Sequence, residues 1–182
     1  MLYAFGFERL GVVVSDLYFV DPNPGKGQEG AERGVRLEVR MLDRGELKGS
    51  IYSAQPIAVD RPVWRADLLE SAAGPYGSFD RTHHHPRFRG WEPGARNFEK
   101  ELSAEPLEWV AARLTDVEGL LEQAGVGLDE IEPADVSGLR AAVPEIMDVV
   151  RRLLARIEAG EAAQPPDSAP ENGLVSARVG WL

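Results

Sequence analysis

The sequence predicts an α+β protein in which an N-terminal antiparallel sheet is followed by a helical pair and a strand-like tail. Three observations lead to this prediction. Apolar residues make up 43% of the 182 residues, a proportion typical of globular proteins. Over residues 1–104 they alternate with polar residues or form short β-branched runs, whereas over 105–160 they recur every three or four positions. A Pro- and Ala-rich linker, 161–172, then precedes a tail at 173–182.

The composition excludes several classes of site. There is no cysteine, so the chain has no disulfide, no thiolate zinc site and no cysteine nucleophile. The formal net charge of -10 argues against broad, non-specific binding to nucleic acid or to anionic membranes. No window approaches the ~18 apolar residues of a membrane span, and the start has no basic leader. We therefore expect a cytoplasmic protein without a membrane partner.

The first strands are predicted from β-branched and aromatic runs. Residues 1–20 are expected to be extended, and 21–30 form a loop because they hold two prolines and three glycines. Residues 35–41 alternate cleanly, which places Val35, Leu37, Val39 and Met41 toward a core and Arg36, Glu38 and Arg40 toward water or another layer.

The later strands are interrupted by prolines. Residues 47–54 are predicted to return as the second arm of a hairpin. Pro56 and Pro62 suggest that any strand near 57–59 is short or lies at an edge. A further strand is predicted from Pro62 to Glu70, with Trp64, Ala66 and Leu68 on one side.

Two helices are predicted after the sheet. The first begins near Ser103, which is a suitable cap, and ends at Gly125. The second begins near Pro133, is interrupted at Pro144 and ends near Ala159. The pair is expected to cover the sheet or to meet a second copy of the chain.

The tail alternates apolar and small or polar residues. This pattern predicts a terminal strand that docks on its own sheet or on that of a partner. The residues expected to make this contact are Val175, Val179 and Trp181. Residues 105–182 are thus the predicted region for binding a protein partner or for self-association.

The segment 79–91 contains all three histidines of the chain. If it is extended, His83 and His85 point to one face and His84 to the other. A His-x-His pair on a strand can supply two ligands to one divalent metal ion, which a carboxylate would complete. The candidate carboxylates are Asp67, Asp80 and Glu92, of which Asp80 is the principal metal candidate. The spacing to the next acid departs from the metal motif of cupins.

The same residues also suggest catalysis without a metal. His83 and His85 can act as general base and general acid, with Asp67 nearby, and Arg87 can hold a phosphate. These parts suit phosphodiester cleavage, for example in RNA.

One resemblance supports this alternative. The order Arg65-Ala66-Asp67, Phe79, the histidine cluster and an amphipathic helix resembles the TumE-type toxins of bacterial toxin–antitoxin pairs. The resemblance implies a small α+β protein with a short histidine-rich segment after its sheet.

Two hypotheses of function remain open. The first is a non-enzymatic accessory protein that binds a partner through its C-terminal strand, with the histidines in a structural loop. The second is a hydrolase-like enzyme that acts on a phosphate-bearing substrate through the histidine and arginine segment. The second hypothesis includes the case of one bound divalent metal ion.

Overall fold

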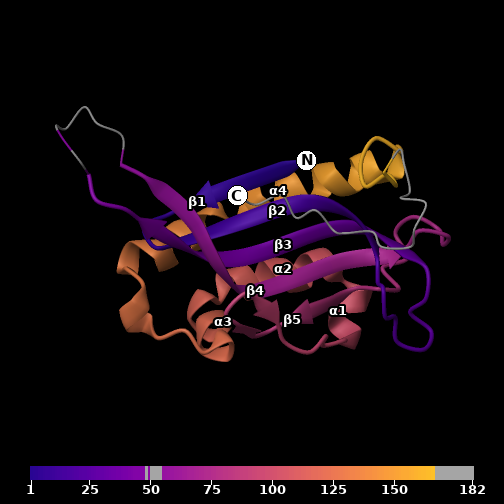
Figure 1. Cartoon of the computed structure of the whole chain (residues 1–182), viewed down its shortest axis with the longest axis horizontal. Coiled ribbons are helices and arrows are strands. Elements are labelled where there is room, and N and C mark those ends of the chain that lie inside the picture. The colour runs from indigo at the N-terminus through magenta and orange to yellow at the C-terminus, as the bar shows by residue number, and fades with distance from the viewer. Residues whose placement is uncertain (48, 50–54, 167–182) are drawn as a thin grey trace.

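The computed structural model describes residues 1–47, 49 and 55–166, and it confirms the α+β class (Figure 1). One antiparallel sheet has the strand order β1-β2-β3-β4-β5. Its strands are β1 (Leu2–Gly6), β2 (Leu10–Val20), β3 (Ala31–Arg44), β4 (Ile57–Ser71) and β5 (His83–His85). A small hairpin follows, made of β6 (Phe88–Arg89) and β7 (Glu92–Pro93).

The sheet differs from the prediction in two places. Residues 1–20 form two strands, because the chain turns at 7–9 and β2 pairs back on β1. β4 is one long strand that continues through Pro62, where a register shift opposite Arg40 accommodates the proline. There no other described strand pairs with β4 on its far side, since β5 pairs with residues 65–67. The predicted return arm at 47–54 lies mostly outside the described residues.

The helices follow the sheet and lie behind it in Figure 1. They are α1 (Lys100–Ala104), α2 (Pro106–Thr115), α3 (Val117–Ala124) and α4 (Pro133–Glu158), with a 3₁₀ turn, η1 (Leu128–Glu130), before α4. The prediction of one helix from Ser103 to Gly125 was wrong, because Asp116 stops α2 and caps α3 by accepting from Gly119 N. α4 continues through Pro144.

The core lies between one face of the sheet and these helices. Strand residues that point to this face are almost completely buried: Val12, Val14, Val35, Leu37, Val39, Trp64, Ala66 and Leu68. From α2, Trp109 stacks on Trp64 with ring centroids 6.1 Å apart. No helix within residues 1–47, 49 and 55–166 has the length and apolar character needed to cross a membrane.

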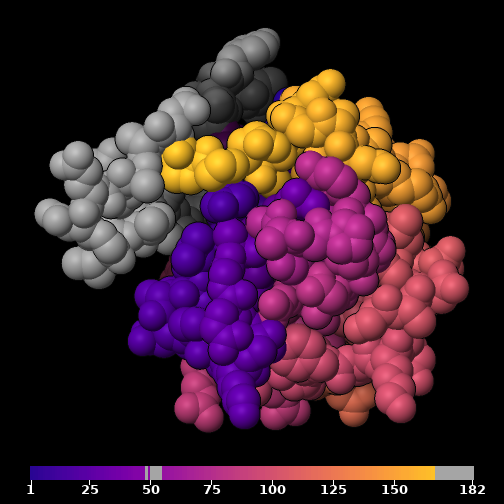
Figure 2. Space-filling model, turned by 90° about the vertical axis from the view of Figure 1, so that its right-hand side faces the viewer, coloured from indigo at the N-terminus to yellow at the C-terminus, as the bar shows by residue number. Residues whose placement is uncertain are grey.

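Three segments distant in sequence meet at one end of the molecule (Figure 2). They are the β2–β3 connection, the loop after β4 and the end of α4. Arg81 donates to Gly27 O, and Arg96 Nη2 donates to Asp21 Oδ2 at 3.0 Å. The chain around β5 is thereby tied to the β2–β3 connection. Part of the predicted linker is also packed, since Ala163 N donates to Asp16 Oδ2 at 2.9 Å.

Candidate metal centre

The histidines occupy the short strand β5, which lies beside β4. His83 is opposite Asp67 and His85 is opposite Arg65. Because residues opposite each other share a face, both histidines and Asp67 lie on the sheet face turned away from the helices. This face, defined by Arg36, Glu38, Arg40, Arg65, Asp67, His83 and His85, is called the polar face below.

His84 points the other way, into the core. Its ring lies 4.9 Å from Trp109 and 6.3 Å from Trp64, measured between centroids. Its Nε2 is 2.8 Å from Glu99 Oε1. Burial lowers the pKa of His84, against the opposing effect of Glu99. His84 therefore anchors β5 to α2, and its two neighbours are left to form the site.

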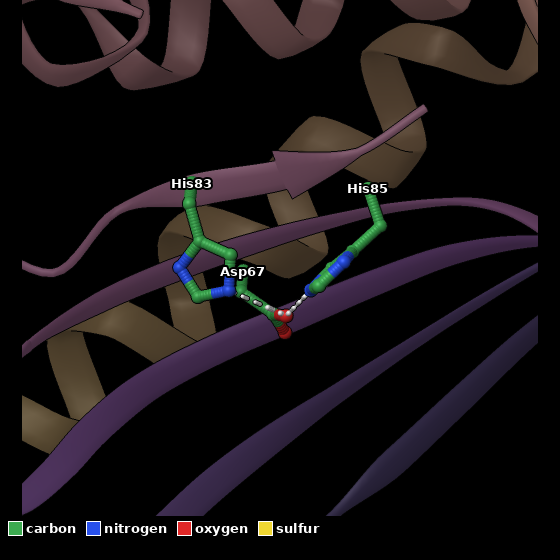
Figure 3. A group of neighbouring side chains, drawn as sticks. All are labelled: Asp67, His83 and His85. Carbon is green, nitrogen blue, oxygen red and sulfur yellow. Dashed lines mark ion pairs between the residues drawn. The ribbon is translucent and has the colours of Figure 1, made fainter. Parts of the chain in front are cut away.

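Asp67, His83 and His85 converge on one point (Figure 3). His83 Nε2 lies 3.4 Å from Asp67 Oδ2, and His85 Nε2 lies 3.5 Å from the same oxygen. The three potential ligand atoms are all within 4.8 Å of one another. The residues are 1%, 2% and 5% exposed, so this is an interior cluster.

The outer ring nitrogens fix the tautomer that each histidine adopts when it is neutral. His83 Nδ1 is 2.8 Å from Arg81 O, and His85 Nδ1 is 2.8 Å from Gly94 O. A carbonyl oxygen only accepts, so each Nδ1 carries a proton and donates it. In the neutral imidazole, Nε2 is then an electron-pair donor that faces Asp67. Burial lowers the pKa of His83 to about 4, although Asp67 opposes the shift, so His83 is neutral at pH 7.

Asp67 uses its other oxygen to bind an arginine. Arg36 Nε donates to Asp67 Oδ1 at 2.6 Å. Burial alone would raise the pKa of Asp67, but the charges of Arg36 and Arg65 hold it far below its usual range. Asp67 is thus ionised and held in place by Arg36, and its Oδ2 faces the two histidines.

A second set of charges lies farther along the polar face. Glu38 is 7% exposed and accepts from Arg65 Nε at 2.8 Å and from Arg40 Nη1. The ring of Phe88 lies 5.1 Å from the Arg65 guanidinium, and that of Trp91 lies 5.0 Å from Arg40. The hairpin β6–β7 therefore covers this part of the sheet.

Arg96 connects the remaining two acids. It is bound to Asp21 at 3.0 Å, whereas Glu32 Oε1 is 4.0 Å away. Glu32 is only 2% exposed, and its buried Oε2 has no hydrogen-bond partner among the residues that the structure describes. Burial raises the pKa of Glu32, although Arg96 and Arg81 counteract this effect. Phe98 closes the same side, with its ring 5.4 Å from that of His83.

The structure brings together only part of the predicted site. His83, His85 and Asp67 are neighbours. Asp80 is outside the group, where its Oδ1 accepts from Ser71 N at 2.8 Å and from Ser78 Oγ at 2.9 Å. Arg87 donates to Gln123 O at 2.6 Å. The predicted docking residues, Val175, Val179 and Trp181, lie outside the described residues.

Arg36 was not predicted as part of the site. The sequence does contain a signal, because charged residues alternate on both β3 and β4. When these two strands pair side by side in the sheet, Arg36 lies opposite Asp67. The register that makes this pairing depends on a β3–β4 connection and a bulge that alternation alone does not reveal.

Comparison with known proteins identifies no similar protein. The chain matches no known family model, no curated protein and no solved structure. The resemblance to TumE-type toxins therefore rests only on the residues quoted for it.

Proposed function

We propose that this protein binds one divalent transition-metal ion through His83 Nε2, His85 Nε2 and Asp67 Oδ2. The observation that carries the proposal is the convergence of two ring nitrogens on one carboxylate oxygen, with both outer nitrogens donating to backbone carbonyls. Such outer hydrogen bonds fix the tautomer of metal-binding histidines. In the neutral tautomer, both Nε2 electron pairs point toward the Asp67 carboxylate in a buried site, where a cation would satisfy all three groups.

The spacing of the atoms suits a metal of this kind. With metal–ligand distances near 2.1 Å, neighbouring ligands of a tetrahedral ion are roughly 3.4 Å apart. The two distances to Asp67 Oδ2 are 3.4 and 3.5 Å. Two imidazoles and one carboxylate suit zinc, iron, manganese, cobalt or nickel, and three protein ligands leave positions for another ligand.

An ion with open positions would supply Lewis acidity and an activated water. The chain supplies the rest: β4 and β5 hold the ligands, Arg36 keeps Asp67 charged, and the aromatic side chains of residues 88–98 limit the entry of bulk water. This arrangement favours the enzymatic hypothesis over the accessory one, and metal-assisted hydrolysis is the reaction we assign to it.

The direct test is metal content. Untagged protein is incubated with Zn²⁺, Mn²⁺, Co²⁺, Ni²⁺ or Fe²⁺ in turn, desalted and subjected to elemental analysis. We expect a single equivalent of at least one ion. His83→Gln and His85→Gln should each lower the metal affinity by a factor of about 10 to 100 or more. Loss of a residue that only hydrogen-bonds to a metal ligand already has an effect of about this size, and these variants remove the ligand itself.

Asp80→Asn is the matched control. Asp80 is an acid close to the histidines in sequence, but its side chain is 45% exposed and lies outside the cluster. This variant should keep its metal. Unchanged binding by both histidine variants, or no binding of any of the five ions, would contradict the proposal. In the latter case, metal-free acid–base catalysis by His83 and His85 becomes the better hypothesis.

A further inference from the structure

The polar face and its rim contain as many paired positive as negative charges. Arg36 is bound to Asp67, Arg40 and Arg65 are bound to Glu38, and Arg96 lies between Asp21 and Glu32. The members of this set are Arg36, Arg40, Arg65, Arg96, Asp21, Glu32, Glu38 and Asp67. A metal ion binds only neutral imidazole, so once His83 and His85 are ligands they add no charge, and the set itself carries no net charge.

A divalent ion would change this balance. It adds two positive charges at a point where the three ligands are at most 5% exposed. Every carboxylate of the set already faces an arginine, so none is left to compensate the ion alone. Protonation of Glu32, whose pKa is raised by burial, would only increase the positive excess. Uncompensated charge in a buried site is costly, and an anion bound from solution would remove that cost.

Arg36 offers the second contact for such an anion. Its Nε donates to Asp67 Oδ1 at 2.6 Å, and the side chain makes no ion pair or hydrogen bond with any other residue in the described part of the chain. The side chain is 25% exposed, whereas the three ligands are at most 5% exposed, so Arg36 is the member of this group that solvent reaches. A guanidinium presents paired donors that match the oxygens of phosphate and carboxylate.

We propose that the substrate has a phosphate or carboxylate group that binds between the metal ion and the Nη groups of Arg36. This inference rests on the metal centre proposed above and extends it by naming the chemical class of the ligand. One oxygen of the group would take an open position on the ion, and a second would accept from Arg36. An uncharged substrate would leave the positive excess in place.

The test uses metal-loaded protein with two probes, inorganic phosphate and oxalate, measured by isothermal titration calorimetry. The Co²⁺ form is examined in parallel, because its visible spectrum changes when an oxygen ligand enters the coordination sphere. We expect at least one probe to bind to the loaded protein, to shift the cobalt spectrum and to bind at least tenfold more weakly without metal. The probe that binds more tightly distinguishes a phosphate-bearing from a carboxylate-bearing substrate.

Arg36→Gln keeps a hydrogen-bond donor near Asp67 but removes the charge and the paired Nη groups. It should weaken anion binding at least tenfold at full metal loading, as checked by elemental analysis. If this variant does not fold, Arg36→Lys replaces it and should weaken binding by a smaller factor. Arg140→Gln is the control, since Arg140 pairs with Glu118 between helices and should leave binding unchanged.

The outcomes separate the two proposals. A protein that binds metal but neither probe overturns the anion site and leaves the metal centre intact. Equal anion binding by Arg36→Gln and the unaltered protein overturns the role of Arg36. A protein that binds none of the ions overturns the metal centre, and the anion site falls with it.

Discussion

Asp135 connects the turn between β1 and β2 to the beginning of α4. Its Oδ1 accepts from the backbone N–H groups of Glu8, Arg9 and Leu10 at 2.8, 2.8 and 2.9 Å. Its Oδ2 accepts from Glu132 N at 2.8 Å, and the residue is 0% exposed. Since hydrogen bonds to a charged group contribute about 1.5–3 kcal/mol, Asp135→Ala should lower the free energy of unfolding by about 3 kcal/mol or more. Urea denaturation measures this loss.

Two further variants give the comparison. Asp135→Asn keeps one acceptor oxygen for the turn and should lose less stability than Asp135→Ala. Asp148→Ala removes an acid of the same helix whose side chain is 69% exposed and pairs with Arg151. Its effect should stay below about 0.5 kcal/mol, as for other surface pairs. A loss below about 1 kcal/mol in Asp135→Ala would show that the buried carboxylate is not what holds this turn.

For single residues, the sequence predicted those side-chain orientations that follow from strand alternation alone. The opposite orientations of His83 and His84 require only an extended segment, which β5 provides. The choice of Asp67 over Asp80 as the neighbouring acid was not predictable, because it depends on which residue of β4 lies opposite His83. Asp135 was also not predicted to be buried, since three of its four backbone partners are more than a hundred positions away.

Among the elements, the β3–β4 pair holds the site together, and Gly34 is a point where the two backbones leave no room for a side chain. A Cβ at Gly34 would overlap the carbonyl oxygen of Leu68 and lie 2.9 Å from Leu69 Cα. These are backbone atoms of the paired strand, so they can move only if β4 moves. Gly34→Ala should therefore destabilise the protein by about 3 kcal/mol, at the upper end of overpacking effects. Thermal or urea unfolding followed by circular dichroism measures the change.

Gly45→Ala is the control for this variant. Gly45 follows β3, and the nearest atom to a Cβ there would be Pro56 Cβ at 3.4 Å, an ordinary contact. We expect its stability to remain within about 0.5 kcal/mol of the unaltered protein, as for other surface changes. Equal effects of the two substitutions would mean that close packing at Gly34 does not matter for the sheet.

Long periodic segments predicted the type of each element better than its ends. The apolar stripe of residues 103–124 predicted helix correctly, but not the break at Asp116, where a side chain replaces a helical hydrogen bond. Conversely, prolines at 62 and 144 suggested interruptions where the structure has a bulged strand and a continuous helix. Residues on both sides of Pro144, such as Val143 and Ile146, are buried, so packing outweighs the local preference.

For the whole molecule, the proposed metal centre lies where three parts of the chain are joined. β4 supplies Asp67, β5 supplies the histidines, and Gly94 O from the segment after β7 holds His85. This assembly exists only in the folded chain, so an ion bound there should stabilise the fold as a unit. Stability, rather than activity, therefore provides a readout of the site that needs no knowledge of the substrate.

We expect the metal-loaded protein to unfold at a higher temperature than the protein treated with a chelator. At free metal a hundredfold above Kd, the gain is about 2.7 kcal/mol, which corresponds to roughly 5–11 °C for a chain of this size. Differential scanning calorimetry at several metal concentrations checks both the shift and its logarithmic growth. His83→Gln should lose the shift because a ligand is missing, whereas Asp80→Asn should retain it. A shift that is equal in all three proteins would place the ion elsewhere on this acidic chain.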